Sequence, residues 1–277
     1  MHWLEAILLG VVQGLTEFLP VSSSGHLVLF QSLMGLEEPE LLFDICLHVG
    51  TLAAVVWTFF PQIVDATKGL LRFAAATRGG KAAMATVWAT DQDARMALLI
   101  IIGTVPTGFI GMGFHKVADK LFASPALAGA MLLITGLILW ATRYVGAEGK
   151  KLSSVTGLNA LVVGTVQGLA ILPGISRSGS TICAALFLGV DREVAARYSF
   201  LLSIPAIVAA LILEVADAGG GSHPPVAMLV TGGVISALTG LAALKWLLAI
   251  VRKGSMWWFA PYCWVVGATV LVANFIK

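Results

Sequence analysis

The sequence has few charged residues. Asp, Glu, Lys and Arg make up only 12% of its 277 residues, whereas a soluble domain carries about 25%. Hydrophobic residues account for 58% of the chain, and the mean hydropathy is +0.93. Because this composition leaves too little polar surface for a soluble domain, we expect an integral membrane protein.

The sequence also lacks the signals that are typical of several other classes of protein. Cys46, Cys183 and Cys263 occur singly in apolar runs without CxxC or CxxH spacing, so neither a disulfide framework nor a zinc site is expected. The formal net charge is +2 and no basic cluster is present, which excludes nucleic acid as an expected partner. The apolar runs do not alternate with polar residues, as transmembrane β-strands would.

Long apolar runs predict transmembrane helices. Each is rich in Leu, Ile, Val and Ala, and about 20 such residues cross the hydrocarbon of a bilayer. Six runs reach that length, at roughly 41–60, 96–114, 121–142, 196–215, 226–250 and 256–276. The fold class expected is therefore all-α and polytopic.

A polar, glycine-containing motif occurs twice inside apolar segments. Val-Gln-Gly-Leu, Leu-Pro and a serine-glycine run appear at 12–15, 19–20 and 22–25, and again at 166–169, 172–173 and 176–179. The offset between the two copies is about 154 residues. Interruptions at matching positions of two halves are typical of a binding site inside a membrane protein.

The positive residues indicate how the two motif segments, about 1–36 and 154–190, enter the membrane. If each turns back at its polar interruption and leaves on the side it entered, the predicted loops 61–95, 143–153, 191–197 and 251–255 share one face, which holds 12 of the 17 Lys and Arg residues. These are Lys68, Arg72, Arg78, Lys81, Arg95, Arg143, Lys150, Lys151, Arg192, Arg197, Arg252 and Lys253. Positive loops stay in the cytoplasm, so this re-entrant arrangement is favoured over two additional crossings.

The sequence therefore predicts a single membrane domain over 1–277 with six transmembrane helices plus two re-entrant helical hairpins. Its halves, about 1–142 and 154–277, form inverted-topology repeats whose hairpin tips approach the midplane from opposite faces. Non-helical backbone at that depth must be covered by protein or line a wet cavity. Two tips that meet would create such a cavity.

Glu17 is a carboxylate inside an apolar stretch, four residues after Gln13 and on the same helix face. A buried carboxylate is costly without a partner. It could bind a hard cation or handle protons, which makes Glu17 a catalytic candidate and Glu17 with Gln13 a candidate metal site. Alternatively, Glu17 pairs with Arg177 only to hold the two halves together.

The second motif suits an anion. Arg177, the hydroxyls of Ser176, Ser178 and Thr181, and the N–H groups of a helix expected to begin at Ser178 or just after it would all favour a phosphate. The alternative is a capped helix start with a structural arginine.

The first motif brings hydroxyls and an imidazole to a similar helix start. Ser22, Ser23, Ser24 and Gly25 precede His26, which lies nine residues after Glu17. A lone histidine is usually structural, but this grouping makes Ser23 or His26 a candidate nucleophile or general acid/base. The remaining residues of the run are candidates for substrate binding.

Residues 13–26 (QGLTEFLPVSSSGH) and 172–181 (LPGISRSGST) closely resemble the two signature motifs of bacterial undecaprenyl-diphosphate phosphatases, the bacitracin-resistance family. The similarity extends along the whole chain, including 197–205 (RYSFLLSIP). The resemblance implies a multi-pass bacterial inner-membrane enzyme with six spans and two re-entrant hairpins. It also implies that the enzyme converts undecaprenyl diphosphate to undecaprenyl phosphate, the lipid carrier reused in cell-wall synthesis.

Further expectations come with this resemblance: a site open to the periplasm and a divalent cation, Mg²⁺ or Ca²⁺. The family has Glu or Gln where this chain has Gln13, so Glu17 carries most of the cation binding. Arg177 would hold the diphosphate, and His26, Ser23 or water would attack phosphorus. A lipid transporter or flippase with a similar headgroup pocket is the competing interpretation. Partners are lipids, and the sequence does not choose between a monomer and a homodimer.

Overall fold

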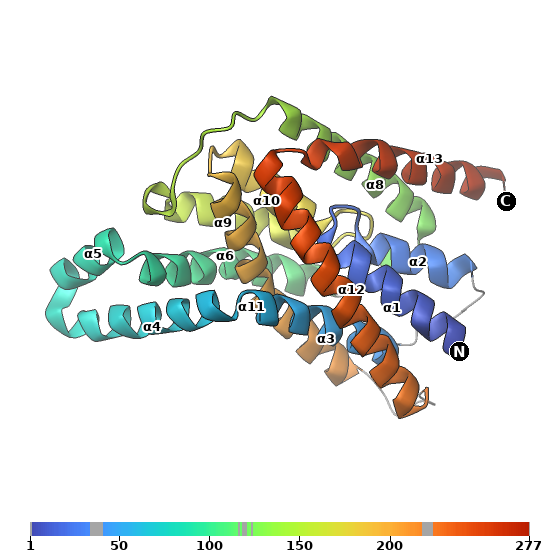
Figure 1. The fold of residues 1–277 in the computed structure, drawn as a ribbon, viewed down its shortest axis with the longest axis horizontal. Coiled ribbons are helices and arrows are strands. Elements are labelled where there is room, and N and C mark those ends of the chain that lie inside the picture. Colours follow the sequence, from blue (N-terminus) through green and yellow to red (C-terminus); the bar gives the residue numbers. More distant parts are fainter. Residues whose placement is uncertain are drawn as a thin grey trace.

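The computed structural model describes residues 2–33, 41–115, 117, 121–122, 124–217 and 224–276, and its regular elements there are helices (Figure 1). The α-helices are α1 (Trp3–Phe18), α2 (Ser23–Leu33), α3 (Leu41–Thr58), α4 (Phe60–Ala76), α5 (Gly80–Thr90), α6 (Gln92–His115), α8 (Pro125–Ala141), α9 (Gly157–Leu169), α10 (Arg177–Phe187), α11 (Arg192–Asp217), α12 (Val226–Lys253) and α13 (Ala260–Ile276). Short 3₁₀ helices lie at Thr77–Gly79, Thr142–Tyr144, Leu152–Ser154 and Met256–Phe259.

The long apolar runs are the long helices. In the described part of the chain, α6, α8, α11, α12 and α13 are five helices long and apolar enough to cross a bilayer. A sixth candidate is α3 together with the helical stretch Phe60–Thr90, which meet at a bend of 75° and form either one broken span or a re-entrant loop. The chain is thus a multi-pass helical membrane protein with five or six apolar helices of spanning length.

The segment 61–95 was expected to be a loop, but most of it is helical. Helices α4 and α5 form an extension at the left of Figure 1, far from both termini. Arg72 donates hydrogen bonds to the carboxylates of Asp91 and Asp93 at the base of this extension. The Asp91 carboxylate also accepts from the backbone N–H of Ala94, and its hydrogen bond from Arg72 lowers its pKa to about 2.

Helices from the two halves of the chain pack on each other. In the first half, α1 and α3 pack on α12 of the second half; in the second half, α9 and α11 pack on α6 of the first. Figure 1 shows α12 crossing α1 and α3, with α8 lying beside α13. Each of these contacts in one half of the chain thus has a counterpart in the other half. Since every one of them joins helices from different halves, the two halves form one interlocked body.

Small residues allow the closest of these contacts. A Cβ added to Gly10 of α1 would lie 2.9 Å from the carbonyl oxygen of Gly232 on α12. At the matching position of the second half, a Cβ on Gly164 of α9 would collide with the carbonyl of Gly103 on α6. Close backbone approach through small residues is how membrane helices gain packing energy when lipid is as apolar as their side chains.

Two pairs of short helices contain the repeated motif. Helix α1 has 16 residues and α2 has 11; α9 has 13 and α10 has 11. At about 1.5 Å per residue the longest of them extends roughly 24 Å, less than the roughly 30 Å of bilayer hydrocarbon. None of the four helices is long enough to span a bilayer alone.

The contact between Gly164 and Gly103 generates a prediction about stability. Gly164→Ala forces a methyl group onto the Gly103 backbone, and overpacking of this kind destabilises by about 1–3 kcal/mol. We expect a lower midpoint of thermal unfolding for the purified protein in detergent. Gly108→Ala in α6 is the matched control, because a Cβ there has no neighbour within 4 Å. Equal midpoints for the two variants would contradict the predicted helix contact.

Candidate active site

The candidate site lies where the turn after α1 meets the turn before α10. Ser22 has φ 69° and Gly174 has φ 94°, so both turns contain a residue in the left-handed region. The Ser22 hydroxyl accepts hydrogen bonds from the N–H of Gly174 at 3.1 Å and of Gly25 at 3.3 Å. A non-glycine residue held in this region costs on the order of 1 kcal/mol, and here the bonds to the Ser22 side chain offset that cost.

The contacts between the turns are reciprocal. A Cβ on Gly25 would lie 3.1 Å from the Cα of Gly174, and a Cβ on Gly179 would lie 2.9 Å from Pro20. The Ser178 hydroxyl donates to the carbonyl of Phe18 at 2.9 Å. Each turn therefore fits against the backbone of the other, and the register between the two halves is fixed at this point.

Helix α10 begins at Arg177, one residue before the predicted start. Its N-cap is Ser176, whose hydroxyl accepts from the N–H of Gly179 at 3.1 Å. The Thr181 hydroxyl is buried and lies 2.5 Å from the hydroxyl of Ser199 on α11. Thr181 therefore ties α10 to α11, whereas Arg177 lies at the open start of the helix.

Glu17 is the centre of the site. Its Oε1 atom forms an ion pair with the Arg177 guanidinium, and its Oε2 atom accepts from Ser23 Oγ at 2.5 Å and from Gln13 Nε2 at 3.1 Å. The side chain of Glu17 is 4% exposed and that of Arg177 is 21% exposed. The Glu17 carboxylate is thus shielded from solvent and both of its oxygens have partners, whereas part of the Arg177 side chain remains accessible to solvent.

His26 points elsewhere. Its Nδ1 atom lies 2.8 Å from the carbonyl oxygen of Ser22 and its Nε2 atom lies 2.8 Å from the hydroxyl of Tyr262 on α13. A carbonyl can only accept, so Nδ1 carries the proton and Nε2 accepts from Tyr262. The His26 and Tyr262 rings are also stacked, with centroids 5.8 Å apart. Tyr262 lies in the predicted apolar span 256–276, and nothing in the sequence indicated that it would contact His26.

The other predicted residues of the first motif lie around the same turn. Ser24 Oγ is 3.4 Å from Ser22 Oγ, and Gly25 is in contact with Gly174. The motifs predicted from sequence are therefore brought together: Gln13, Ser23 and Arg177 all contact Glu17, while His26 lies to one side of them, toward α13.

The donor atoms present are compatible with a hard cation. The Oε1 atom of Gln13 is buried and has no hydrogen-bond partner among the described residues. Glu17 adds a carboxylate and Ser23 a hydroxyl beside it. No group of three or more His, Cys, Asp or Glu residues gathers in the described ranges. Mg²⁺ is commonly held by one or two carboxylates together with water and substrate phosphates, so this sparse oxygen set fits such an ion.

A multi-pass membrane protein with an acid, a guanidinium and a serine hydroxyl at a buried helix start has the features of a membrane enzyme that acts on phosphate. The family comparison makes the class specific. Residues 6–269 match the family model described as bacitracin resistance protein BacA. The chain belongs to this family.

Curated relatives cover this chain almost completely. A protein of Desulfatibacillum aliphaticivorans named undecaprenyl-diphosphatase is 83% identical over 276 residues and covers 100% of both chains. Proteins of the same name from Desulforapulum autotrophicum and Methanobrevibacter smithii are 47% and 38% identical, covering 98% or more of each chain.

Proposed function

We propose that the two turns around Glu17 and Arg177 form the catalytic centre of this chain. The chain is an undecaprenyl-diphosphate phosphatase: it removes the terminal phosphate of undecaprenyl diphosphate and returns the monophosphate carrier to peptidoglycan synthesis. This function rests on full-length identity to enzymes of that name and on membership of the bacitracin-resistance family. The observation that carries the assignment of the site is the contact of Glu17 with both Arg177 and Ser23.

Arg177 binds the diphosphate. It sits at the first position of α10, where backbone N–H groups and the helix dipole favour an anion. When the anhydride breaks, negative charge grows on the departing monophosphate, and a fixed guanidinium beside it stabilises that charge. Ser176 and Ser178 hold the turn in shape through Gly179 and Phe18.

Ser23 is the nucleophile that this geometry favours. Its hydroxyl already donates to Glu17, so the carboxylate is placed to take the proton as Ser23 Oγ attacks the terminal phosphorus. The bond to the bridging oxygen breaks, undecaprenyl phosphate leaves, and a phosphoserine remains. Glu17 gives the proton it took from Ser23 to the departing undecaprenyl phosphate and is ionised again. Water then attacks the phosphoserine, and Glu17 takes the proton of the water and returns it to Ser23 Oγ as the bond between this oxygen and phosphorus breaks, which releases inorganic phosphate. His26, bonded to Tyr262 and Ser22, positions the turn that carries Ser23.

A divalent cation, Mg²⁺ or Ca²⁺, is part of the proposal. Glu17 and the orphaned Oε1 atom of Gln13 are the groups that would hold it. When bound, the ion would neutralise phosphate charge as a Lewis acid.

We further propose that α1–α2 and α9–α10 are re-entrant hairpins of two inverted repeats. Three observations support this: the four helices are short, the packing pairs exchange between halves, and Lys and Arg gather on one predicted face. In this arrangement that face is cytoplasmic, and the catalytic centre opens to the periplasm of the inner membrane. Inverted repeats also occur in transporters, but the named relatives are phosphatases.

The first prediction from the proposed mechanism concerns the ion pair. Arg177→Ala and Glu17→Ala should each lower turnover of undecaprenyl diphosphate at least ~100-fold, the scale of losing one transition-state contact. Phosphate release by purified protein in detergent measures this. Arg143→Ala is the matched control, because Arg143 lies over the rings of Trp140 and Tyr144 and should keep full activity. Near-normal release by either site variant would remove that residue from the mechanism.

The second prediction identifies the nucleophile. Rapid quenching with ³²P-labelled substrate should trap an acid-stable phosphoenzyme, as expected of phosphoserine, and Ser23→Ala should abolish the adduct. Ser24→Ala is the control, since its hydroxyl contacts Ser22 rather than Glu17. An acid-labile adduct would assign the attack to His26 instead, and no adduct in any variant would assign it to water.

The third prediction concerns orientation. In a chain whose three cysteines are replaced by alanine, Val226→Cys at the exposed start of α12 should react with a membrane-impermeant maleimide in intact spheroplasts. Arg78→Cys, between α4 and α5, should react only after permeabilisation. The reverse pattern would mean that the catalytic centre opens to the cytoplasm.

A further inference from the structure

An aromatic side chain outside both motifs contacts the turn that carries Ser23. Tyr262 lies in the first turn of α13, and its hydroxyl donates to Nε2 of His26 at 2.8 Å. The two rings are nearly parallel, at an interplanar angle of 7°. The neighbouring Cys263 contacts the carbonyl oxygen of Pro20 in the same turn through its sulfur, at 3.6 Å. The start of α13 therefore touches the first catalytic turn at two successive residues.

The bond from Tyr262 determines which nitrogen of His26 carries the proton. Because Nε2 accepts from a hydroxyl, the hydrogen of the neutral ring is on Nδ1. Nδ1 donates to the carbonyl oxygen of Ser22 at 2.8 Å, and the backbone N–H of His26 donates to the same oxygen at 3.2 Å. His26 is only 4% exposed, so little water competes for these bonds.

The carbonyl oxygen of Ser22 constrains the position of Ser23. This oxygen lies in the plane of the peptide bond that joins the two residues, together with the N and Cα atoms of Ser23. A contact that holds the oxygen therefore holds Ser23 Cα, and with it the positions open to Ser23 Oγ. That atom is 2.5 Å from Glu17 Oε2. Tyr262 is thus linked to the proposed nucleophile through a single imidazole ring.

Helix α13 is packed tightly enough to hold this turn in a fixed place. It lies against α8, where a Cβ on Gly267 would be 2.7 Å from the carbonyl oxygen of Gly129. Trp264 of α13 also donates from Nε1 to the carbonyl oxygen of Leu133 on α8, at 3.2 Å. Close backbone approach of this kind gives membrane helices their packing energy, so α8 and α13 form one rigid pair.

Helix α8 in turn holds the second catalytic turn. The Thr135 hydroxyl donates to the carbonyl oxygen of Gly174 at 2.8 Å and accepts from the N–H of Ser176 at 3.1 Å. Thr135 is 1% exposed. Ser176 directly precedes Arg177, the proposed anion-binding residue. The α8–α13 pair therefore contacts both turns and fixes the spacing between the proposed nucleophile and the guanidinium.

We propose, on the basis of the function assigned above, that Tyr262 is a positioning residue of the reaction. Acting through His26, it holds Ser23 Oγ against Glu17 in the geometry from which the hydroxyl attacks phosphorus. Its part in the reaction is confined to this contact. Such a residue lowers the barrier of the chemical step without adding to the binding of the substrate, so it acts on kcat rather than on KM.

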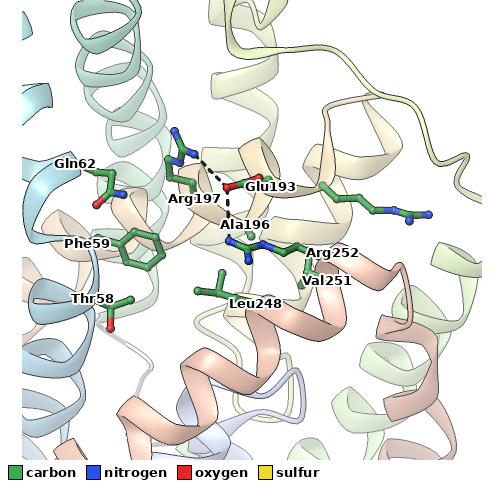
Figure 2. Close-up of a pocket in the computed structure, with 10 residues that line it drawn as sticks. Thr58, Phe59, Gln62, Glu193, Ala196, Arg197, Leu248, Val251 and Arg252 are labelled. Carbon is green, nitrogen blue, oxygen red and sulfur yellow. Dashed lines mark hydrogen bonds and ion pairs between the residues drawn. The ribbon is translucent and has the colours of Figure 1, made fainter.

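A polar cluster elsewhere in the chain gives a control. Figure 2 shows the Glu193 carboxylate between the guanidinium groups of Arg197 and Arg252, at 3.4 Å and 3.6 Å, beside a pocket at the bend between α3 and α4. These side chains are exposed, and exposed ion pairs contribute little to stability. The ion pairs join these residues to each other and not to a catalytic turn, so Glu193→Gln should change neither kcat nor KM.

The test measures kcat and KM for phosphate release from undecaprenyl diphosphate by the purified full-length protein in detergent. Tyr262→Phe removes the hydroxyl and keeps the ring that stacks on His26. We expect kcat to fall about 10-fold, because a displacement of reacting groups by about 1 Å costs up to roughly 100-fold. KM and the midpoint of thermal unfolding should stay unchanged. Tyr144→Phe is the matched control, because Tyr144 is 77% exposed and its hydroxyl has no part in the site.

A double variant distinguishes positioning through His26 from general packing of α13. In a His26→Ala background, Tyr262→Phe should cause no further loss of kcat, because the residue through which the hydroxyl acts is absent. Wild-type kcat in Tyr262→Phe, a loss confined to KM, or losses that multiply in the double variant would overturn the proposal. Phosphate release by the wild type and by Ser23→Ala tests the catalytic assignment itself, so the two failures are distinguishable.

Discussion

The ion pair between Glu17 and Arg177 is the constraint on which the rest of the structure depends. A carboxylate buried to 4% exposure among apolar helices is tolerable only with an opposite charge beside it. That charge comes from the other half of the chain, so the two turns must meet. Three features hold the two turns together. Ser22 adopts a left-handed conformation, Gly25 lies close to Gly174, and α1 packs on α12 while α9 packs on α6.

The same arrangement places the proposed reacting groups where little water reaches them, since the Glu17 side chain is 4% exposed. Ser23 donates to one oxygen of Glu17 while Arg177 engages the other, so the proposed nucleophile and the proposed anion-binding group both contact the carboxylate that we propose as the base. Next to Glu17 along α1, the ring of Phe18 contacts Phe200, which is stacked on Phe59 at the bend between α3 and α4.

Sequence patterns predict those features that depend on composition and short spacing. Long apolar runs locate the spanning helices, and the repeated motif brings Gln13, Glu17, Ser23 and Arg177 to one place because each motif ends a helix in the same way. Features that depend on contacts between residues far apart in the sequence cannot be predicted from it. The bond from Tyr262 to His26 joins residues 236 apart, and nothing in an apolar run marks which tyrosine has a partner. The segment 61–95 was read as a loop because its charges obscure the helical pattern of α4 and α5.

A double-mutant cycle on the free energy of unfolding tests the central contact most directly. Glu17→Gln and Arg177→Met each leave one charge buried without its partner, at about 3–5 kcal/mol, whereas the double variant leaves neither. If the two side chains touch, the double variant loses less stability than the two single variants lose together. Simple additivity, as found for residues with no shared contact, would contradict the account.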